Sequence, residues 1–589
     1  MITSRATLRM VLATVIAAVA VTASAADRRI AFKRPAGWTN TPHIHAYAND
    51  VPLPGCDNQE MTAVPGKAGW YWFTIYNAPE QHNVMFNNGG WGGGQTGPLY
   101  LDSQGDRALS ASDGDVISVA DEGVWDAIDD VPTPQPAATS KIRFHRPDDW
   151  NGVPRLIAYK EKNIERTATN RVIYEVFVRN FSPEGTLKGV ERQISRLKEL
   201  GVDIVWLMPI YTMGEQGKWG TYASPYAVRD YKAVSPEYGS SEDLRSLVNA
   251  IHAAGMEVWL DWVANHTALD HAWVSQHREY YRTSGGNIVN PHGWNDVYQL
   301  DYSNNGLRSA MIDALQYWVR EFDIDGYRCD YADGVPRDFW RQARAEVNKI
   351  KPIGWLAESG GDGENAKLVS EDGIFDYNYA WGFRDKLAEF AGHGDVNTLK
   401  RLCSELFYDN AYNGKSRMVY LSNHDVVQDK GGTEDRTMGA RLAPLTVLQF
   451  TVYGMPLIYN GQEIKYSSAP IVLAEKTPID WNSGDANMTS LIKSLTTLKH
   501  SEPALRTAGE RGDLINYDVT HSSVYVYERR LGAESVVVML NFSGSTAEFN
   551  VNGNLPSAPY LDVFSGTSRN LASADTFSLP PYGYAVYVK

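Results

Sequence analysis

Arg328 and Asp330 carry side chains that could do chemistry on a polar substrate, and they lie two positions apart in the segment Gly326–Asp330. This segment is predicted as the end of a buried strand, where side chains two apart point to the same face. A guanidinium beside a carboxylate favours the ionised form, which is the form that attacks as a nucleophile. Taken alone, the segment fits a structural ion pair as well as a catalytic pair.

Three more predicted strands end in polar residues. Asn265 and His266 follow one strand, Glu358 ends another, and His424 and Asp425 follow a third. Each group by itself is typical of a helix cap. Four such groups in order, all at the carboxyl ends of strands, instead favour an active site.

The elements that would position these residues alternate between strand and helix patterns over residues 171–500. Apolar runs such as residues 204–209 predict buried strands, and the spacing of residues 241–254 predicts a helix. This alternation predicts a (β/α)8 TIM barrel, in which reactive residues gather at the carboxyl ends of the strands. A short insertion is expected after the third strand, at about residues 267–300.

The four polar segments resemble, in order and in strand placement, the four signature regions of the α-amylase family of glycoside hydrolases. The resemblance extends from about residue 171 to residue 589. It implies that Asp330 is the nucleophile, Glu358 the general acid/base and Asp425 the stabiliser of the transition state. It also implies that four side chains contact the reacting glucose: Tyr226, His266, Arg328 and His424. Pro225, next to Tyr226, departs from the glycine that is usual in the family.

The resemblance implies an α-amylase that hydrolyses internal α-1,4-glucosidic bonds of starch with retention. In retaining glycosidases the two carboxyl groups lie about 5–5.5 Å apart, one to attack and one to protonate the leaving oxygen. We expect Arg328 to keep Asp330 ionised, and we expect burial and the Asp330 charge to raise the pKa of Glu358. Two alternatives stay open. One is a cyclodextrin- or pullulan-cleaving hydrolase or an α-glucan transferase of the same family, and the other is a starch-binding protein without catalysis.

A calcium ion is also implied by the resemblance, because Asn265 matches a calcium-ligating asparagine of many family members. Oxygen ligands suit Ca²⁺, and Asp301 lies near the fifth signature region of the family. The histidine that usually follows the nucleophile by four residues is replaced here by Gly334. No organic cofactor is expected.

Residues 26–130 are predicted to form a separate β-sandwich, from alternating patterns and from glycine-rich turn signals. The region resembles the starch-binding modules of carbohydrate-binding family twenty-six, at residues 32–47, 54–55, 69–71, 84–88 and 95–96. Leu53 departs from that pattern, since tryptophan is common at its position. The candidates for the sugar-binding face are His45, Tyr47 and Trp72, and an ordinary core or surface role fits each of them equally.

An internal repeat links the first module to the region before the barrel. Residues 142–147 repeat the pattern of residues 30–35, within a linker region predicted over residues 131–170 that begins with a proline-rich stretch. The repeat is interpreted as a remnant of a second module, or alternatively as a strand pair that serves the domain junction. Residues 501–589 have the alternating pattern of a C-terminal antiparallel β domain.

The 589 residues carry a formal net charge of −15, which argues against nucleic acid or an anionic membrane as a partner. Residues 1–25 are predicted as a signal peptide, with a basic start, a short apolar stretch and a small-residue cleavage site. We therefore expect an exported protein, extracellular or periplasmic, that acts on starch or a related α-glucan without membrane insertion. Three cysteines, Cys56, Cys329 and Cys403, form no metal-binding or redox pattern.

Overall fold

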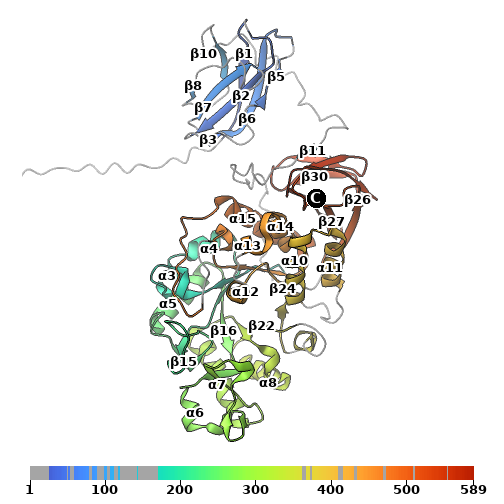
Figure 1. Cartoon of the computed structure of the whole chain (residues 1–589). Coiled ribbons are helices and arrows are strands. Elements are labelled where there is room, and N and C mark those ends of the chain that lie inside the picture. The colour runs from blue at the N-terminus through green and yellow to red at the C-terminus, as the bar shows by residue number, and fades with distance from the viewer. Residues whose placement is uncertain are drawn as a thin grey trace, which may run out of the picture. The chain divides into compact units, whose positions relative to one another are not determined.

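The structure is a computed structural model that divides into two compact units, residues 1–137 and 138–589 (Figure 1). The predicted signal peptide, the proline-rich start of the linker, Leu53 and Cys56 lie outside the described residues. The described residues are 26–36, 38–48, 51–52, 59–64, 66–78, 82–88, 99–101, 107–111, 117–119, 142–143, 170–360, 366–371, 374–408, 416–429, 434–467, 473–507, 511–553 and 555–589.

Eight strands form a closed barrel in the second unit. All of their pairings are parallel, and the first strand pairs with both the second and the eighth, which closes the ring. This confirms the predicted TIM barrel. In barrel order the strands are β12 (Ile173–Val176), β13 (Ile204–Leu207), β16 (Glu257–Val263), β21 (Gly326–Asp330), β22 (Gly354–Ala357), β23 (Tyr377–Tyr379), β24 (Ser416–Val419) and β25 (Met455–Tyr459).

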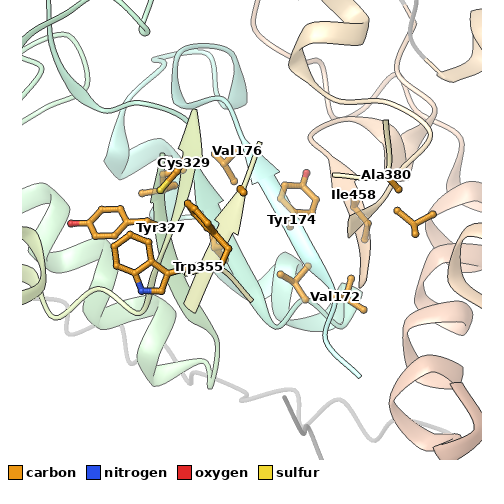
Figure 2. Packing of buried hydrophobic residues seen from close by; sticks show 14 of the residues in the cluster. Val172, Tyr174, Val176, Tyr327, Cys329, Trp355, Ala380 and Ile458 are labelled. Atoms are coloured by element: carbon orange, nitrogen blue, oxygen red, sulfur yellow. The ribbon is translucent and has the colours of Figure 1, made fainter. Parts of the chain in front are cut away.

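Successive residues of each barrel strand face opposite sides, and the two sides have separate cores. Tyr327 and Cys329 of β21 belong to the large core between the strands and the surrounding helices, where Figure 2 shows them near Trp355 of β22. Cys329 is a buried free thiol, as expected of a small core residue. Arg328, between the two, faces the barrel interior, where its guanidinium lies over the ring of Trp206.

Helices surround the barrel and connect its strands (Figure 1). The helix α5 (Ser241–Ala253) begins at a capping box formed by Ser240 and Asp243, close to where the sequence predicted it. The other helices are α2 (Val178–Phe181), α3 (Leu187–Glu191), α4 (Ile194–Leu200), α7 (Asn305–Phe322), α8 (Arg337–Val347), α9 (Lys367–Ser370), α10 (Trp381–His393), α11 (Val396–Tyr408), α12 (His424–Asp429), α13 (Glu434–Met438), α14 (Leu442–Thr451) and α15 (Ala486–Ser501).

Two excursions of the chain follow barrel strands at their carboxyl ends. After β13 come β14 (Tyr211–Met213) and β15 (Val228–Val234), which pair with each other and enclose the loop that carries Tyr226. After β16, β17 (His266–Ala268) pairs with β20 (Val297–Gln299). Between these two strands lie α6 (Ala272–Gln276), β18 (Thr283–Ser284), β19 (Asn287–Ile288) and a 3₁₀ turn at Pro291–Gly293.

The C-terminal part of the second unit is a sheet of mostly antiparallel strands, as predicted. Its C-terminal strands are β26 (Asp513–Val519), β27 (Val524–Leu531), β28 (Glu534–Asn541), β29 (Ala547–Asn552), β30 (Ala558–Asp562), β31 (Ser568–Leu571), β32 (Thr576–Leu579) and β33 (Tyr584–Val588).

One strand of this C-terminal sheet comes from before the barrel. The short β11 (Ile142–Arg143) pairs in parallel with β32. These are the first residues of the internal repeat, and their pairing favours the interpretation as a junction strand. The rest of the repeat, residues 144–160, lies outside the described residues.

The first unit consists of β strands arranged in two sheets, with order β10-β9-β1-β6-β5 in one and β3-β2-β7-β8 in the other, where β4 also pairs with β2. Its buried core draws residues from both sheets, such as Ile30 and Ile44. The strands are β1 (Ala26–Lys33), β2 (Pro42–Ala48), β3 (Val51–Pro52), β4 (Gln59–Glu60), β5 (Thr62–Ala63), β6 (Trp70–Ala78), β7 (His82–Asn88), β8 (Leu99–Leu101), β9 (Arg107–Ala111) and β10 (Ile117–Val119).

The structure does not bring all three predicted sugar-binding residues of this unit onto one sheet. His45 and Tyr47 belong to β2, and half-buried His45 alternates with the core residues Ile44 and Ala46. Trp72 belongs to β6 in the other sheet. His45 and Trp72 therefore cannot share one flat sheet face, and the side chain of Tyr47 is not among those described.

Among the residues that the structure describes, no helix has both the length and the apolar character needed to cross a membrane.

Candidate active site

A single guanidinium joins the carboxylates at the ends of three neighbouring barrel strands. Arg328 is 0% exposed. Its Nη1 donates to Asp261 Oδ1 at 2.8 Å and to Asp330 Oδ1 at 3.1 Å, and its Nη2 forms an ion pair with Glu358 Oε2 at 2.7 Å. Its Nε donates to the Tyr379 hydroxyl at 3.1 Å. The arginine thus fixes Asp330 and Glu358 around one small volume at the end of β21 and β22.

The register of the strands explains why these groups meet. Asp261 of β16 is the direct partner of Arg328 in β21, and Cys329 is the partner of Ala357, the last residue of β22. Glu358 follows that residue, and its backbone N–H donates to the carbonyl of Cys329. Because the strands are parallel and in register, their polar ends must lie at the same mouth of the barrel.

His424 is the centre of a second group of polar side chains. Its Nε2 lies 2.8 Å from the Tyr226 hydroxyl and 3.4 Å from Asp425 Oδ1, and its Nδ1 hydrogen-bonds the buried carboxylate of Glu175. The rings of Tyr226 and His424 stack with centroids 5.3 Å apart. The Tyr226 hydroxyl also donates to Asp261 Oδ2 at 3.0 Å, which connects this group to the Arg328 cluster.

His266 lies beside Asn265 at the end of the third strand, as predicted. The two side chains are 3.2 Å apart at His266 Nδ1 and Asn265 Nδ2, and the His266 ring contacts the indole of Trp294 with centroids 5.4 Å apart. Burial lowers the pKa of His266 to about 4, so the ring is neutral at neutral pH.

Burial raises the pKa of both carboxyl groups that flank Arg328. For Glu358 the charge of Asp330 adds to the rise and Arg328 opposes it, in the direction expected for a group that must donate a proton. Asp330 departs from our expectation, because burial outweighs the Arg328 charge and raises its pKa as well. Arg328 limits this rise rather than reversing it.

The neighbouring carboxylates keep His424 protonated. Burial by itself would lower its pKa, but Asp425 and Glu175 outweigh burial and raise the pKa to about 9. An imidazolium is therefore present at neutral pH, with one N–H held by Glu175 and the other directed toward Tyr226 and Asp425.

Three residues of this arrangement were not predicted from the sequence. Glu175 is a lone carboxylate inside an apolar strand, and Asp261 is another in the third strand. A charged residue within an apolar run is visible in the sequence and could have marked both as site residues. Tyr379 lies on β23, a strand of three residues that the sequence patterns did not reveal.

The calcium site expected at Asn265 stays a prediction, and the position of its usual histidine has no room for a side chain. A Cβ atom added at Gly334 would lie 2.3 Å from a ring carbon of Tyr331 and 2.7 Å from Asn265 Oδ1, so the tyrosine ring fills the space of the usual histidine. Across the described part of the chain, no group of three or more His, Cys, Asp or Glu side chains is arranged to hold a metal ion. Asp301 instead accepts from the backbone of Ser303 in a turn. No step proposed below uses a metal.

Replacing Arg328 by methionine is expected to lower the free energy of unfolding by about 3–5 kcal/mol, because the buried carboxylates lose their counter-charge. Arg328 lowers the pKa of both Asp330 and Glu358, so its loss raises both. A higher pKa at Asp330 moves the acid limb of the kcat/KM profile to higher pH, and a higher pKa at Glu358 moves the alkaline limb in the same direction.

Thermal unfolding and the pH profile of kcat/KM measure both effects. Arg328→Lys is the matched control, since it keeps the charge and should leave the profile closer to its original pH. An Arg328→Met profile that stays in place or moves to lower pH would contradict the electrostatic role.

Comparison with known proteins shows the family of the chain. The family described as "Alpha amylase, catalytic domain" matches residues 143–299 and 292–510, and "Maltogenic Amylase, C-terminal domain" matches residues 517–586. The arrangement is that of a glycoside hydrolase. The chain belongs to the α-amylase family.

Relatives within this family carry different activity names. The chain is 26% identical over 440 residues to Alpha-amylase 2 of Dictyoglomus thermophilum, covering 67% of this chain and 72% of that protein. It is 26% identical over 431 residues to a cyclomaltodextrinase of Geobacillus thermopakistaniensis, covering 68% and 70%. The crystal structure of an α-amylase from Lactobacillus plantarum has a TM-score of 0.62 and 31% identity, and the match covers 71% of this chain and 99% of that one.

Proposed function

We propose that the protein hydrolyses internal α-1,4-glucosidic bonds in starch and related α-glucans with retention of configuration. The observation that carries this proposal is the shared contact of Arg328 with Asp330 and Glu358 on adjacent strands. Retention needs two carboxyl groups about 5–5.5 Å apart, and a guanidinium that touches both supports such a spacing.

In the proposed first step, Asp330 attacks the anomeric carbon while Glu358 gives its proton to the glycosidic oxygen. The bond to the leaving glucan breaks and a covalent glucosyl ester of Asp330 forms. In the second step, Glu358 takes a proton from water, the water oxygen bonds to the anomeric carbon, and Asp330 leaves as a carboxylate. Asp330 and then water each invert the anomeric carbon once, so the product keeps the α configuration.

The other residues of the site would hold the reacting glucose and its developing charge. Tyr226 offers its ring face to the sugar, and Asp425 offers carboxylate oxygens to hydroxyl groups and to the positive charge of the transition state. His266, neutral, and His424, protonated, would donate to sugar hydroxyls. Glu175 would keep His424 charged and oriented.

A second candidate function within the family is cleavage of cyclodextrin or pullulan, or glucan transfer. This second function is supported by the relative named cyclomaltodextrinase and by the maltogenic α-amylase of Bacillus acidopullulyticus. The match to the C-terminal domain of maltogenic amylases supports it as well. A starch-binding protein without catalysis is a remote third, since the chain carries Asp330, Glu358, Asp425 and Arg328.

A product time course separates these functions. Amylose, pullulan and β-cyclodextrin are supplied in parallel, and the anomeric configuration of the first products is read by NMR. We expect fast release of mixed short α-anomeric products from amylose and slower cleavage of the other two. Initial β-anomers would contradict retention, preferred attack on cyclodextrin or pullulan would favour the second function, and absence of reducing ends would favour the third.

We further propose that residues 26–130 form a starch-binding β-sandwich and that residues 1–25 direct export. The support for the first is the resemblance at residues 69–71 and 84–88, and the support for the second is the basic and apolar pattern of residues 1–25. Binding to the polymer would raise the local concentration of substrate at the barrel. His45 and Tyr47 on β2 are the proposed sugar contacts, and Trp72 would act on the other sheet.

A further inference from the structure

Three aromatic rings form a cluster beside the acid/base carboxylate that the mechanism above does not use. Trp294 and His292 come from the insertion after β16, and Tyr331 follows the nucleophile. The ring centroids are 5.9 Å apart for Trp294 and Tyr331, 5.1 Å for His292 and Tyr331, and 5.0 Å for His292 and Trp294. We call these three residues the aromatic platform.

The platform is open to solvent at its tryptophan. Trp294 is 41% exposed, and few large hydrophobic side chains in the described part of the chain are exposed to this degree. Leaving an indole in water forgoes the free energy that burial of an aromatic ring normally gives. An exposed aromatic surface at the edge of a polar site is therefore a candidate for ligand contact.

The backbone places the platform next to Glu358. Tyr331 has left-handed backbone angles, φ 41° and ψ 49°, which are unfavourable for a bulky residue. In this conformation its N–H donates to Glu358 Oε2 at 2.8 Å. The ring lies over Gly334, where any side chain would collide with it. Glycine at position 334 thus makes room for the Tyr331 ring. The backbone N–H of the same tyrosine holds Glu358, so the ring lies close to the acid/base group.

The contact with Glu358 indicates which part of the substrate meets the platform. Glu358 is the group proposed to protonate the oxygen that leaves, so it faces the leaving portion of the glucan. The groups proposed to hold the reacting glucose, such as Tyr226 and His424, cluster instead around Asp261 and Glu175. Trp294 contacts both His266 and Tyr331, so it extends from the reacting glucose toward the leaving side.

We propose that the aromatic platform binds the glucosyl residues of the leaving portion of the α-glucan, through stacking of their C–H faces on Trp294 and Tyr331. This inference rests on the proposed function and names the residues that recognise the part of the chain beyond the cleaved bond. Glucose rings have apolar C–H faces that pack on aromatic rings without loss of the hydrogen bonds of their hydroxyls. Longer leaving portions would cover more of the platform and would be cleaved more efficiently.

The test compares two substrates with very different leaving groups. Maltoheptaose has a glucan leaving portion, whereas α-maltosyl fluoride releases fluoride, which is too small to touch the platform. Trp294→Ala is expected to lower kcat/KM for maltoheptaose by about tenfold, as for truncation of a well-placed aromatic contact, and the loss on α-maltosyl fluoride is expected to be much smaller. Trp294→Phe should recover most of the loss.

Tyr408→Ala is the matched control. Tyr408 is also exposed, at 54%, but it ends α11 just before β24, at the barrel end opposite the active site. We expect this variant to change neither kcat/KM value. An equal loss on both substrates in Trp294→Ala, or no loss on either, would overturn the platform while leaving the proposed hydrolysis intact. A wild-type protein that cleaves neither substrate would overturn the proposed function and this inference with it.

Discussion

Replacement of Asp330 by alanine is expected to reduce hydrolysis of maltoheptaose by about ten-thousand-fold or more, because it removes the carboxylate proposed to form the glucosyl ester. The cavity left by the lost carboxylate should admit a small anion. With α-maltosyl fluoride and added azide, the azide would attack the anomeric carbon directly and expel fluoride. This single displacement inverts the centre, so the product should be β-maltosyl azide.

The anomer of the azide product is the decisive readout, and it is measured by NMR. Glu199→Gln, which removes an exposed carboxylate paired with Lys493 on the barrel exterior, is the control and should hydrolyse normally. The Asp330→Ala variant should still bind insoluble starch, since the proposed binding module is elsewhere in the chain. Hydrolysis near the wild-type rate, or an α-azide product, would show that Asp330 is not the nucleophile.

Replacement of Glu358 by alanine is expected to give the opposite anomer. Fluoride leaves without a proton donor, so α-maltosyl fluoride should still form the ester with Asp330, but water should then attack slowly because the base is missing. Azide needs no base, and its attack on the ester completes a double displacement that yields α-maltosyl azide. On maltoheptaose, whose leaving oxygen needs the proton, we expect a loss of about a thousand-fold or more.

The contrast between the two substrates separates an acid/base role from a structural one. A general acid is needed far more for the sugar alkoxide than for fluoride, so the ratio of the two rates should change by orders of magnitude in Glu358→Ala. Glu358→Gln keeps the shape of the side chain, and its ratio of the two rates should match that of Glu358→Ala. Equal losses on both substrates would mean that Glu358 supports the site without transferring protons.

The sequence predicted the barrel and the four polar strand ends for a simple physical reason. In a parallel barrel the strands are buried on both faces and read as apolar runs, so a charged residue at the end of a run is conspicuous. Asp330 and Glu358 stand at such ends, and Asp425 follows β24 within a few residues. Parallel pairing then requires these ends to meet, which the register of β16, β21 and β22 shows.

Other parts of the site depend on contacts that no local pattern displays. Glu175 acts on His424 across 249 positions of sequence, and the role of a carboxylate in an apolar strand becomes clear only when its partner is known. The platform joins Trp294 to Tyr331 through the insertion. The pKa of Asp330 was expected to follow its arginine, but burial of the whole cluster proved the larger effect.

The closed ring of the barrel also sets a condition on how the protein is made. Ile173 of the first strand pairs with Leu457 of the eighth, so one edge of the first strand has no neighbour until the eighth has been synthesised. At about 5 to 20 residues per second, this delay lasts about 15 to 60 s. During that interval an apolar strand edge is available to any other nascent strand. Chaperone binding to the nascent chain should therefore be strongest while residues 173–457 are being synthesised. It should end once β25 has left the ribosomal exit tunnel.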